Sequence, residues 1–200
     1  MGQERKVSGT PQEAGTPTRQ RLIDVAIDLF RQHSFAGTSL QMISDELGLT
    51  KSAIYHHFRT RDELLSAVME PLIGELAVIV EEAEALRGPR ARAEYVLRGY
   101  AALAAANRHL LPVLNGDPGV VGMLRERTQW GSIVVRQMRL LAGVEPGAGG
   151  TVKAAIVMAG ISAAAGVEFG DLDDDALREQ LLAAGRRTLG LRPPRRSARA

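Results

Sequence analysis

Apolar side chains recur at helical spacing along most of this chain. In the first such stripe, over residues 17–34, they follow the spacing i, i+3, i+4, i+7 and i+8, which places them on one face of a helix. Further helices are expected at residues 40–47, 50–58, 61–87, 90–107, 109–115, 120–142, 151–169 and 174–189. The pattern therefore predicts an all-α fold with about nine helices.

Two short helices joined by a glycine form the most informative part of the sequence. Thr38 or Ser39 precedes the first of them as an N-cap, and Thr50 precedes the second. Gly48 lies between them and can reverse the chain at positive φ without a steric penalty. The expected buried positions are Leu40, Ile43, Leu47, Ile54 and Phe58. Two such helices joined by a glycine turn are typical of a helix-turn-helix.

The outer face of the second short helix has a distinctive chemistry. From residue 49 to residue 61 the sequence contains three cationic residues, two histidines and no acid. Hydroxyl groups add further donors, and Ala53 leaves room for close approach. These side chains suit contacts to phosphates and to base edges in a DNA groove. An ordinary solvated helix explains this segment equally well when it is taken alone, so the interpretation depends on its neighbours.

The neighbouring residues carry a family resemblance. The run FAGTSLQMISDELGLTKSAIYHHFRTRDELL, preceded by a helix that ends in LF, resembles the DNA-binding domain of TetR-family transcriptional regulators over roughly residues 18–65. The resemblance implies an N-terminal three-helix DNA-binding domain, followed by a helical domain that binds a ligand and forms a homodimer. It also implies a repressor that binds a near-palindromic double-stranded operator and is released by a small molecule.

The same resemblance assigns residues to the DNA interface. Two of them occupy the entry to the second helix, six occupy the face that such proteins lay in the major groove, and two hold the phosphate backbone. In that order they are Ser39 and Gln41; Thr50, Lys51, Ser52, Ala53, Tyr55 and His56; and His57 and Arg61.

Four segments are expected along the chain. Residues 1–16 have almost nothing to bury and are expected to be a disordered tail. Residues 17–60 form the helix-turn-helix domain, and residues 61–190 form the ligand-binding and dimerisation domain. Residues 191–200 contain two prolines and four arginines, and are expected to be a basic disordered tail.

A proline interrupts the expected fourth helix. Pro71 cannot donate to the carbonyl group four residues earlier, and its ring crowds the preceding turn, so a kink is expected there. The kink either wraps the helix around the core or serves as a pivot for a conformational switch.

The last two helices point to self-association. The segment 151–169 is rich in alanine and glycine, which lets helix backbones approach closely. By the family resemblance, this helix and the one at residues 174–189 form a four-helix bundle with their copies in a second subunit. The alternative is that the two helices bury each other within one chain.

Composition narrows the possible functions. The sequence has no cysteine, which excludes disulfides and thiolate sites and fits a reducing cytoplasm. The longest uncharged apolar run, residues 154–167, has 14 residues, against about 20 for a membrane span. The adjacent histidines at 56 and 57 project about 100° apart on a helix, which suits neither a metal pair nor a catalytic triad. We therefore expect a cytoplasmic protein that is not an enzyme, needs no cofactor or metal, and does not bind membranes.

The sequence says least about the ligand and the residues that bind it. Five residues are candidates for lining a pocket in the body, although residues of each type more often belong to an ordinary core: Tyr100, His109, Trp130, Met138 and Met158. Few charges lie among them, which favours a hydrophobic or aromatic small molecule. The alternative function is a DNA-organising protein with the same fold and no ligand gating.

Overall fold

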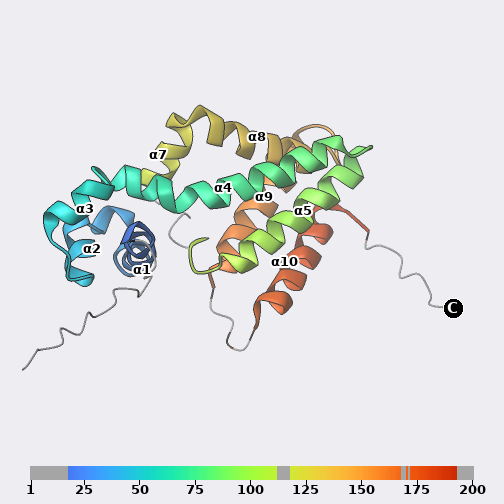
Figure 1. The fold of residues 1–200 in the computed structure, drawn as a ribbon. Helices are drawn as coiled ribbons and strands as arrows, with labels where there is room; N and C mark the ends of the chain where they lie inside the picture. Colours follow the sequence, from blue (N-terminus) through green and yellow to red (C-terminus); the bar gives the residue numbers. More distant parts are fainter. Residues whose placement is uncertain (1–17, 112–117, 168–169, 171, 193–200) are drawn as a thin grey trace, which may run out of the picture.

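The computed structural model describes residues 18–111, 118–167, 170 and 172–192. Within those residues the regular structure consists of nine helices and no strand, which confirms the all-α class. Figure 1 shows a group of three helices, α1–α3, at one end, joined through the long helix α4 to a larger helical body. The tail expected at residues 1–16, most of the tail expected at 191–200, and residues 112–115 of one expected helix lie outside the described residues.

The N-terminal group contains α1 (Thr18–Gly37), α2 (Leu40–Glu46) and α3 (Lys51–His57). The hydroxyl oxygens of Ser39 and Thr50 accept hydrogen bonds from backbone N–H groups three residues further on, at 3.1 and 3.3 Å. Each hydroxyl thereby satisfies one of the free donors at a helix start. Gly48 lies between α2 and α3 with φ 63°, where a Cβ would be strained. The helix-turn-helix expected from the sequence is therefore confirmed.

The junction between α1 and α2 is more elaborate than a simple turn. Ser34 breaks the helical conformation of α1 with φ 63° and ψ 167°, at the position where the sequence predicts the helix end. One more turn then carries Phe35 into the core, where its ring centroid lies 5.3 Å from that of Phe30. The buried Thr38 hydroxyl lies 2.8 Å from the carbonyl oxygen of Ser34 and 3.2 Å from that of Leu29. These contacts hold the start of α2 against the end of α1.

Helix α4 (Arg61–Ala85) connects the two parts of the protein. It begins after Thr60, whose hydroxyl oxygen accepts a hydrogen bond from the backbone of Glu63 at 3.1 Å. The helix continues on both sides of Pro71, and the kink expected there stays a prediction. Six apolar residues of α4 recur at helical spacing along one face, and all of them are buried: Leu65, Val68, Met69, Leu72, Ile73 and Leu76.

Five helices form the body around α4. In Figure 1, α5 lies between α4 and α10, and the contacts between these helices agree with that order. Helix α8 packs against α4, α5 and α9, and α10 packs against α5 and α9. The bounds are α5 (Pro89–Ala106), α7 (Pro118–Glu126), α8 (Thr128–Ala142), α9 (Ala148–Ala165) and α10 (Asp174–Leu189). For α10 the bounds agree with the sequence pattern.

The prediction of a single long helix at residues 120–142 is wrong. The chain leaves the helical conformation at Arg127 (φ −83°, ψ 86°), which separates α7 from α8. The Arg127 guanidinium donates to the Ser66 hydroxyl oxygen on α4 at 2.7 Å and lies 4.6 Å from the centroid of the Trp130 ring. These partners hold Arg127 in a non-helical conformation. The apolar stripe in the sequence therefore continues past Arg127, although the helix is interrupted there.

Two smaller expectations also fail. The apolar pattern of the helix expected at residues 90–107 would bury Tyr95 together with Val96 and Leu103, but Tyr95 is 38% exposed and its hydroxyl donates to the Glu82 carboxylate on α4. Val96 and Leu103 are buried. Helix α9 begins at Ala148, three residues before the start expected at residue 151, and ends at Ala165.

Helix α9 leaves an apolar face uncovered. Val152 and Ile156 lie one turn apart on it and are each 56% exposed, and the small residues Ala155, Ala159 and Gly160 continue the same exposed face. By length and composition α9 is also the one helix of the described chain that could cross a membrane, and 33% of it is buried inside the protein. Its other face packs against α8 and α10. The exposed face is therefore free to contact something outside this chain.

Candidate nucleic-acid interface and internal cavity

The outward face of α3 gathers most of the residues expected to contact DNA. Lys51, Ser52, Tyr55 and His56 are exposed, as is the capping residue Thr50. Ala53 and His57 are half-buried at the edges of this face, which we call the α3 face. Thr50 and Lys51 lie at the N-terminal end of the helix, where the free backbone N–H groups favour anions. The arrangement is one that can approach phosphates and the floor of a groove together.

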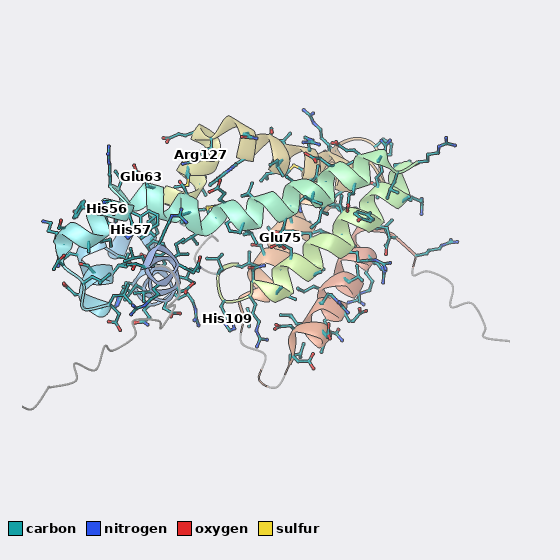
Figure 2. All side chains as sticks on the ribbon, in the orientation of Figure 1. His56, His57, Glu63, Glu75, His109 and Arg127 are labelled. Atoms are coloured by element: carbon teal, nitrogen blue, oxygen red, sulfur yellow. The ribbon has the colours of Figure 1, made fainter. Side chains whose placement is uncertain are left out.

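Two pairs of side chains on α3 contact each other. The Lys51 Nζ atom lies 5.8 Å from the centroid of the Tyr55 ring, one helical turn away. The rings of His56 and His57 meet edge to face with centroids 5.3 Å apart. Figure 2 shows this histidine pair at the end of the molecule formed by α1–α3, while His109 lies apart on the body. The pairs keep four potential donors close to one surface.

The entry to α2 is partly occupied by its own contacts. The Ser39 hydroxyl oxygen accepts the capping hydrogen bond from Met42, which leaves its proton free to donate. The Gln41 amide is exposed and donates to the Asp45 carboxylate at 2.6 Å. Both residues therefore remain on the expected surface, and Gln41 must exchange one intramolecular partner for any contact with DNA.

Arg61 differs from its expected role. The sequence assigns it to a phosphate, but in the structure its Nη1 atom lies 3.2, 2.9 and 3.0 Å from the carbonyl oxygens of Phe35, Ala36 and Thr38. Its guanidinium carbon also lies 5.2 Å from the centroid of the Phe35 ring. Arg61 thus ties the first turn of α4 to the junction between α1 and α2. This contact favours a positioning role for Arg61 over a direct contact with DNA.

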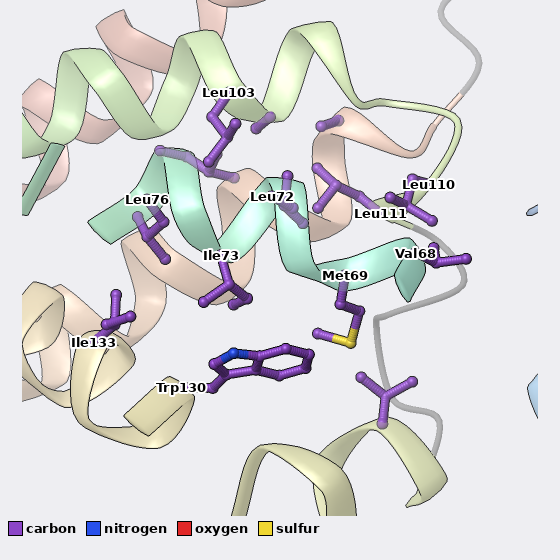
Figure 3. Close-up of a cluster of buried hydrophobic side chains, with 14 of the residues drawn as sticks. Val68, Met69, Leu72, Ile73, Leu76, Leu103, Leu110, Leu111, Trp130 and Ile133 are labelled. Carbon is purple, nitrogen blue, oxygen red and sulfur yellow. The ribbon is translucent and has the colours of Figure 1, made fainter. Parts of the chain in front are cut away.

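A cavity of about 180 Å³ lies in the body and is lined by residues of α4, α5, α7, α8 and α9 and by Leu111. Apolar side chains form most of its wall, and in the described chain no charged residue lines it. Tyr100 and Met158, two of the five expected ligand residues, are among the lining residues. Figure 3 shows the side chains of Leu72, Ile73 and Leu76, which α4 contributes to this region.

The other three expected ligand residues lie elsewhere. His109 is exposed and Met138 is half-buried against the core, and neither lines the cavity. Trp130 is buried and is not among the lining residues, although Figure 3 shows its ring beside Met69 and Ile73, which are. A ligand contact at Trp130 therefore stays a prediction.

The cavity contains polar groups that the apolar pattern hides. The Tyr100 hydroxyl donates to the carbonyl oxygen of Met158 at 3.1 Å and is also hydrogen-bonded to Ser162. Burial raises the pKa of Tyr100, so the phenol is neutral at physiological pH. Gln137 also lines the cavity and is 1% exposed. Sequence reasoning missed Gln137, although a glutamine four residues from both Ile133 and Leu141 on a buried stripe was an available signal.

The geometry defines a class of protein. A compact three-helix domain with a capped helix-turn-helix and an acid-free outer face stands on a helical body with an internal cavity. The face of α3 suits nucleic acid, and in the described residues no cluster of three or more potential metal ligands occurs. This is the architecture of a helix-turn-helix DNA-binding protein with a separate helical body.

Comparisons with known proteins agree with this class. Residues 22–68 match the model of the tetR family of bacterial regulatory proteins. The HTH-type transcriptional regulator AcrR of Shigella flexneri is 44% identical over 70 residues, which are 34% of this chain and 32% of that protein. A probable acrEF/envCD operon repressor of Escherichia coli K12 is 39% identical over 61 residues, which are 30% of this chain and 28% of that protein. The similarity thus spans about a third of the length of these relatives.

The similarity in fold extends much further than the similarity in sequence. The ketosteroid transcriptional regulator KstR2 of Mycobacterium tuberculosis superposes with a TM-score of 0.68 at 15% identity, covering 89% of this chain and 95% of that one. At this identity the likeness shows the fold alone. Residues 22–68 therefore form a DNA-binding domain of the tetR family of bacterial regulatory proteins.

Proposed function

We propose that this protein is a transcriptional repressor that binds a near-palindromic operator as a homodimer and is released by a small, mainly apolar ligand. The observation that carries the proposal is the α3 face, which is exposed, free of acids and held by two capped helices within the family's DNA-binding domain. The family consists of regulators that generally repress, and a matched relative is named a repressor. The protein would act in the cytoplasm, where the DNA is.

In the proposed complex the α3 face enters the major groove. Lys51, Ser52, Tyr55 and His56 are the exposed residues that contact DNA there, and Ala53 allows the helix to approach the bases closely. Thr50, His57 and Ser39 lie at the edges of the face, where the phosphate backbone of the groove passes. Phosphate contacts would fix the register of the helix, and the contacts to base edges would select the sequence.

The proposed dimer uses the uncovered surface of α9 together with α10. The exposed face of α9 carries no charge among Val152, Ala155, Ile156, Ala159 and Gly160. Helix α10 presents small or polar exposed residues such as Ala176, Gln180 and Ala184 beside it. Covering this face with a second copy removes apolar surface from water and brings two α3 faces to one side of DNA. Two such reading heads suit half-sites about one helical turn, or about 34–36 Å, apart.

Selection from random double-stranded DNA tests the proposal. We expect the full chain to enrich a near-palindromic site, and we expect its affinity for that site to fall steeply with salt concentration because phosphate contacts release counterions. Light scattering of the complex should give two chains per site. Weak binding without sequence preference would contradict the proposal and favour a DNA-organising protein.

Two variants with matched controls locate the interface. Lys51→Ala and Tyr55→Ala should each weaken operator binding by about tenfold or more, because each removes a contact in both subunits. The control for Lys51 is Arg90→Ala, an equal loss of charge at the start of α5. The control for Tyr55, which is 44% exposed, is Tyr95→Ala, whose parent tyrosine is 38% exposed on the body. Equal effects at the α3 residues and their controls would exclude α3 as the recognition helix.

A further inference from the structure

One polar group inside the cavity has no partner. The Nε2 atom of Gln137 is buried and has no hydrogen-bond partner in the described part of the chain. The residue is 1% exposed and lines the cavity of about 180 Å³. A buried amide N–H without a partner is costly, and native proteins satisfy nearly all such groups. This N–H group is therefore suited to hydrogen-bond something that enters the cavity.

The other polar groups of the cavity wall are already paired. The Tyr100 hydroxyl donates to Met158 and is hydrogen-bonded to Ser162, so these two side chains satisfy each other. The remaining lining residues that the structure describes are apolar, and none of them is charged. The cavity therefore offers one free donor in an apolar surrounding, with no counter-ion for a charged ligand. An anion or a cation would lose its hydration without compensation there.

We propose that the cavity binds an uncharged, mainly apolar molecule of about one ring with a single hydrogen-bond acceptor, such as a carbonyl oxygen, and that Gln137 Nε2 donates to that acceptor. The size follows from the volume, since a cavity of about 150 Å³ lined by apolar side chains is known to hold benzene. The proposal rests on the function proposed above, in which this cavity is the effector site. It adds the chemical class of the effector and the residue that selects it.

Selectivity for the acceptor follows from the burial of Gln137. A ligand with a carbonyl oxygen satisfies the amide, whereas a hydrocarbon of the same shape leaves it unpaired in both the free and the bound state. A site built around a buried donor rejects the analogue that lacks the partner. The preference for the acceptor should therefore disappear when the donor is removed.

Acetophenone and ethylbenzene test this directly, because they differ only in a carbonyl group replacing a methylene group. Their binding to the full chain is measured by calorimetry without DNA, and benzoate serves as the charged probe. We expect acetophenone to bind the parent at least about tenfold more tightly than ethylbenzene, a difference of about 1.4 kcal/mol, and benzoate not to bind. In Gln137→Leu the two neutral compounds should bind equally. The control is Gln129→Leu, an exposed glutamine at the start of α8, which should keep the parent's preference.

Three results would overturn the proposal: equal binding of the two neutral compounds by the parent, an unchanged preference in Gln137→Leu, or no binding of acetophenone by the parent. The ratio of the two affinities within one variant is insensitive to small differences in stability between variants. Operator binding is measured separately on the ligand-free parent and on Gln137→Leu. If the parent does not bind an operator, the proposed function is contradicted. If the parent binds an operator but shows no preference for acetophenone, only the assignment of Gln137 is contradicted.

Discussion

Replacing Arg61 with alanine separates two roles that its position allows. In the structure a single guanidinium nitrogen reaches three carbonyl oxygens at the end of α1 and the start of α2, and the group stacks on Phe35 at 5.2 Å. If these contacts define its role, Arg61→Ala should destabilise the DNA-binding domain. If Arg61 serves DNA instead, the same change should weaken operator binding and leave stability unaltered.

The size of the expected loss follows from these contacts. Nη1 carries two protons, so the three carbonyl oxygens share two hydrogen bonds from a charged donor. Such bonds contribute about 1.5–3 kcal/mol each when buried, but Arg61 is half-exposed, so we take about 2 kcal/mol for the pair. Stacking on Phe35 adds about 0.5–1 kcal/mol. The expected loss of unfolding free energy is therefore about 2.5–3 kcal/mol, which for a chain of this size lowers Tm by about 5–12 °C.

Urea unfolding followed by circular dichroism measures this loss. Arg59→Ala is the control. Arg59 lies two residues before Arg61, carries the same charge and has an exposed side chain. Its replacement should change stability by less than about 0.5 kcal/mol. The reasoning is refuted if Arg61→Ala and Arg59→Ala have the same stability. Operator binding by both variants, measured well below their melting temperatures, then shows whether Arg61 contacts DNA as well.

Three further changes test the body of the protein. Burial opposes ionisation of Glu94, but the hydrogen bonds and positive charges of Arg186 and Arg98 together outweigh it and hold the pKa of Glu94 below the ordinary value of 4.5. Stability from these contacts should be present above about pH 4.5 and lost as the pH falls through the lowered pKa, and Glu94→Gln should remove that dependence in acid unfolding curves. Gly150→Ala would place a Cβ 1.8 Å from a backbone carbonyl oxygen and should cost at least about 2 kcal/mol in urea unfolding, whereas Gly74→Ala on α4 meets nothing within 4 Å and should add about 0.5–1 kcal/mol. Ile156→Arg should convert the dimer to monomers in light scattering without loss of helicity, since this side chain is 56% exposed in the single chain, and a dimer of unchanged affinity would refute the assigned interface.

Local signals in the sequence were sufficient for the DNA-binding domain. Ser39, Gly48 and Thr50 each act through neighbours within three residues, so their roles are readable from the chain and are confirmed by the structure. The same holds for α10, which begins after the capping residue Asp173 and ends at Gly190 in the left-handed conformation. Capping and turn chemistry depend on short-range geometry, which the order of residues alone specifies.

Long-range contacts account for what the sequence did not reveal. Arg127 breaks a continuous apolar stripe because its partner is Ser66, 61 positions earlier in the chain. Arg61 contacts carbonyl oxygens at the end of α1, a partner that its own segment of the sequence does not reveal. The cavity combines residues of five helices, so no periodicity within one helix could show that Gln137 faces it while Trp130 does not. In each case the deciding partner is brought near by packing rather than by spacing in the chain.

Helix α4 belongs to both halves of the proposed switch. Its first residue holds the junction between α1 and α2, and Met69 and Leu72 on the same helix line the cavity. At 1.5 Å per residue, Arg61 and Met69 are about 12 Å apart along the helix axis. A ligand in the cavity therefore bears directly on the helix that orients the DNA-binding domain.

Linkage makes this arrangement testable in either direction. A ligand can lower the affinity for the operator only by as much as it prefers the DNA-free arrangement of α4. The operator must then lower the affinity for the ligand by the same factor, so a ~30-fold loss measured on one side has to appear as a ~30-fold loss on the other. Acetophenone affinities measured with and without operator DNA give this factor independently of any transcription assay. Equal affinities in the two conditions would mean that occupation of the cavity does not reach α3, and the cavity would then be no effector site.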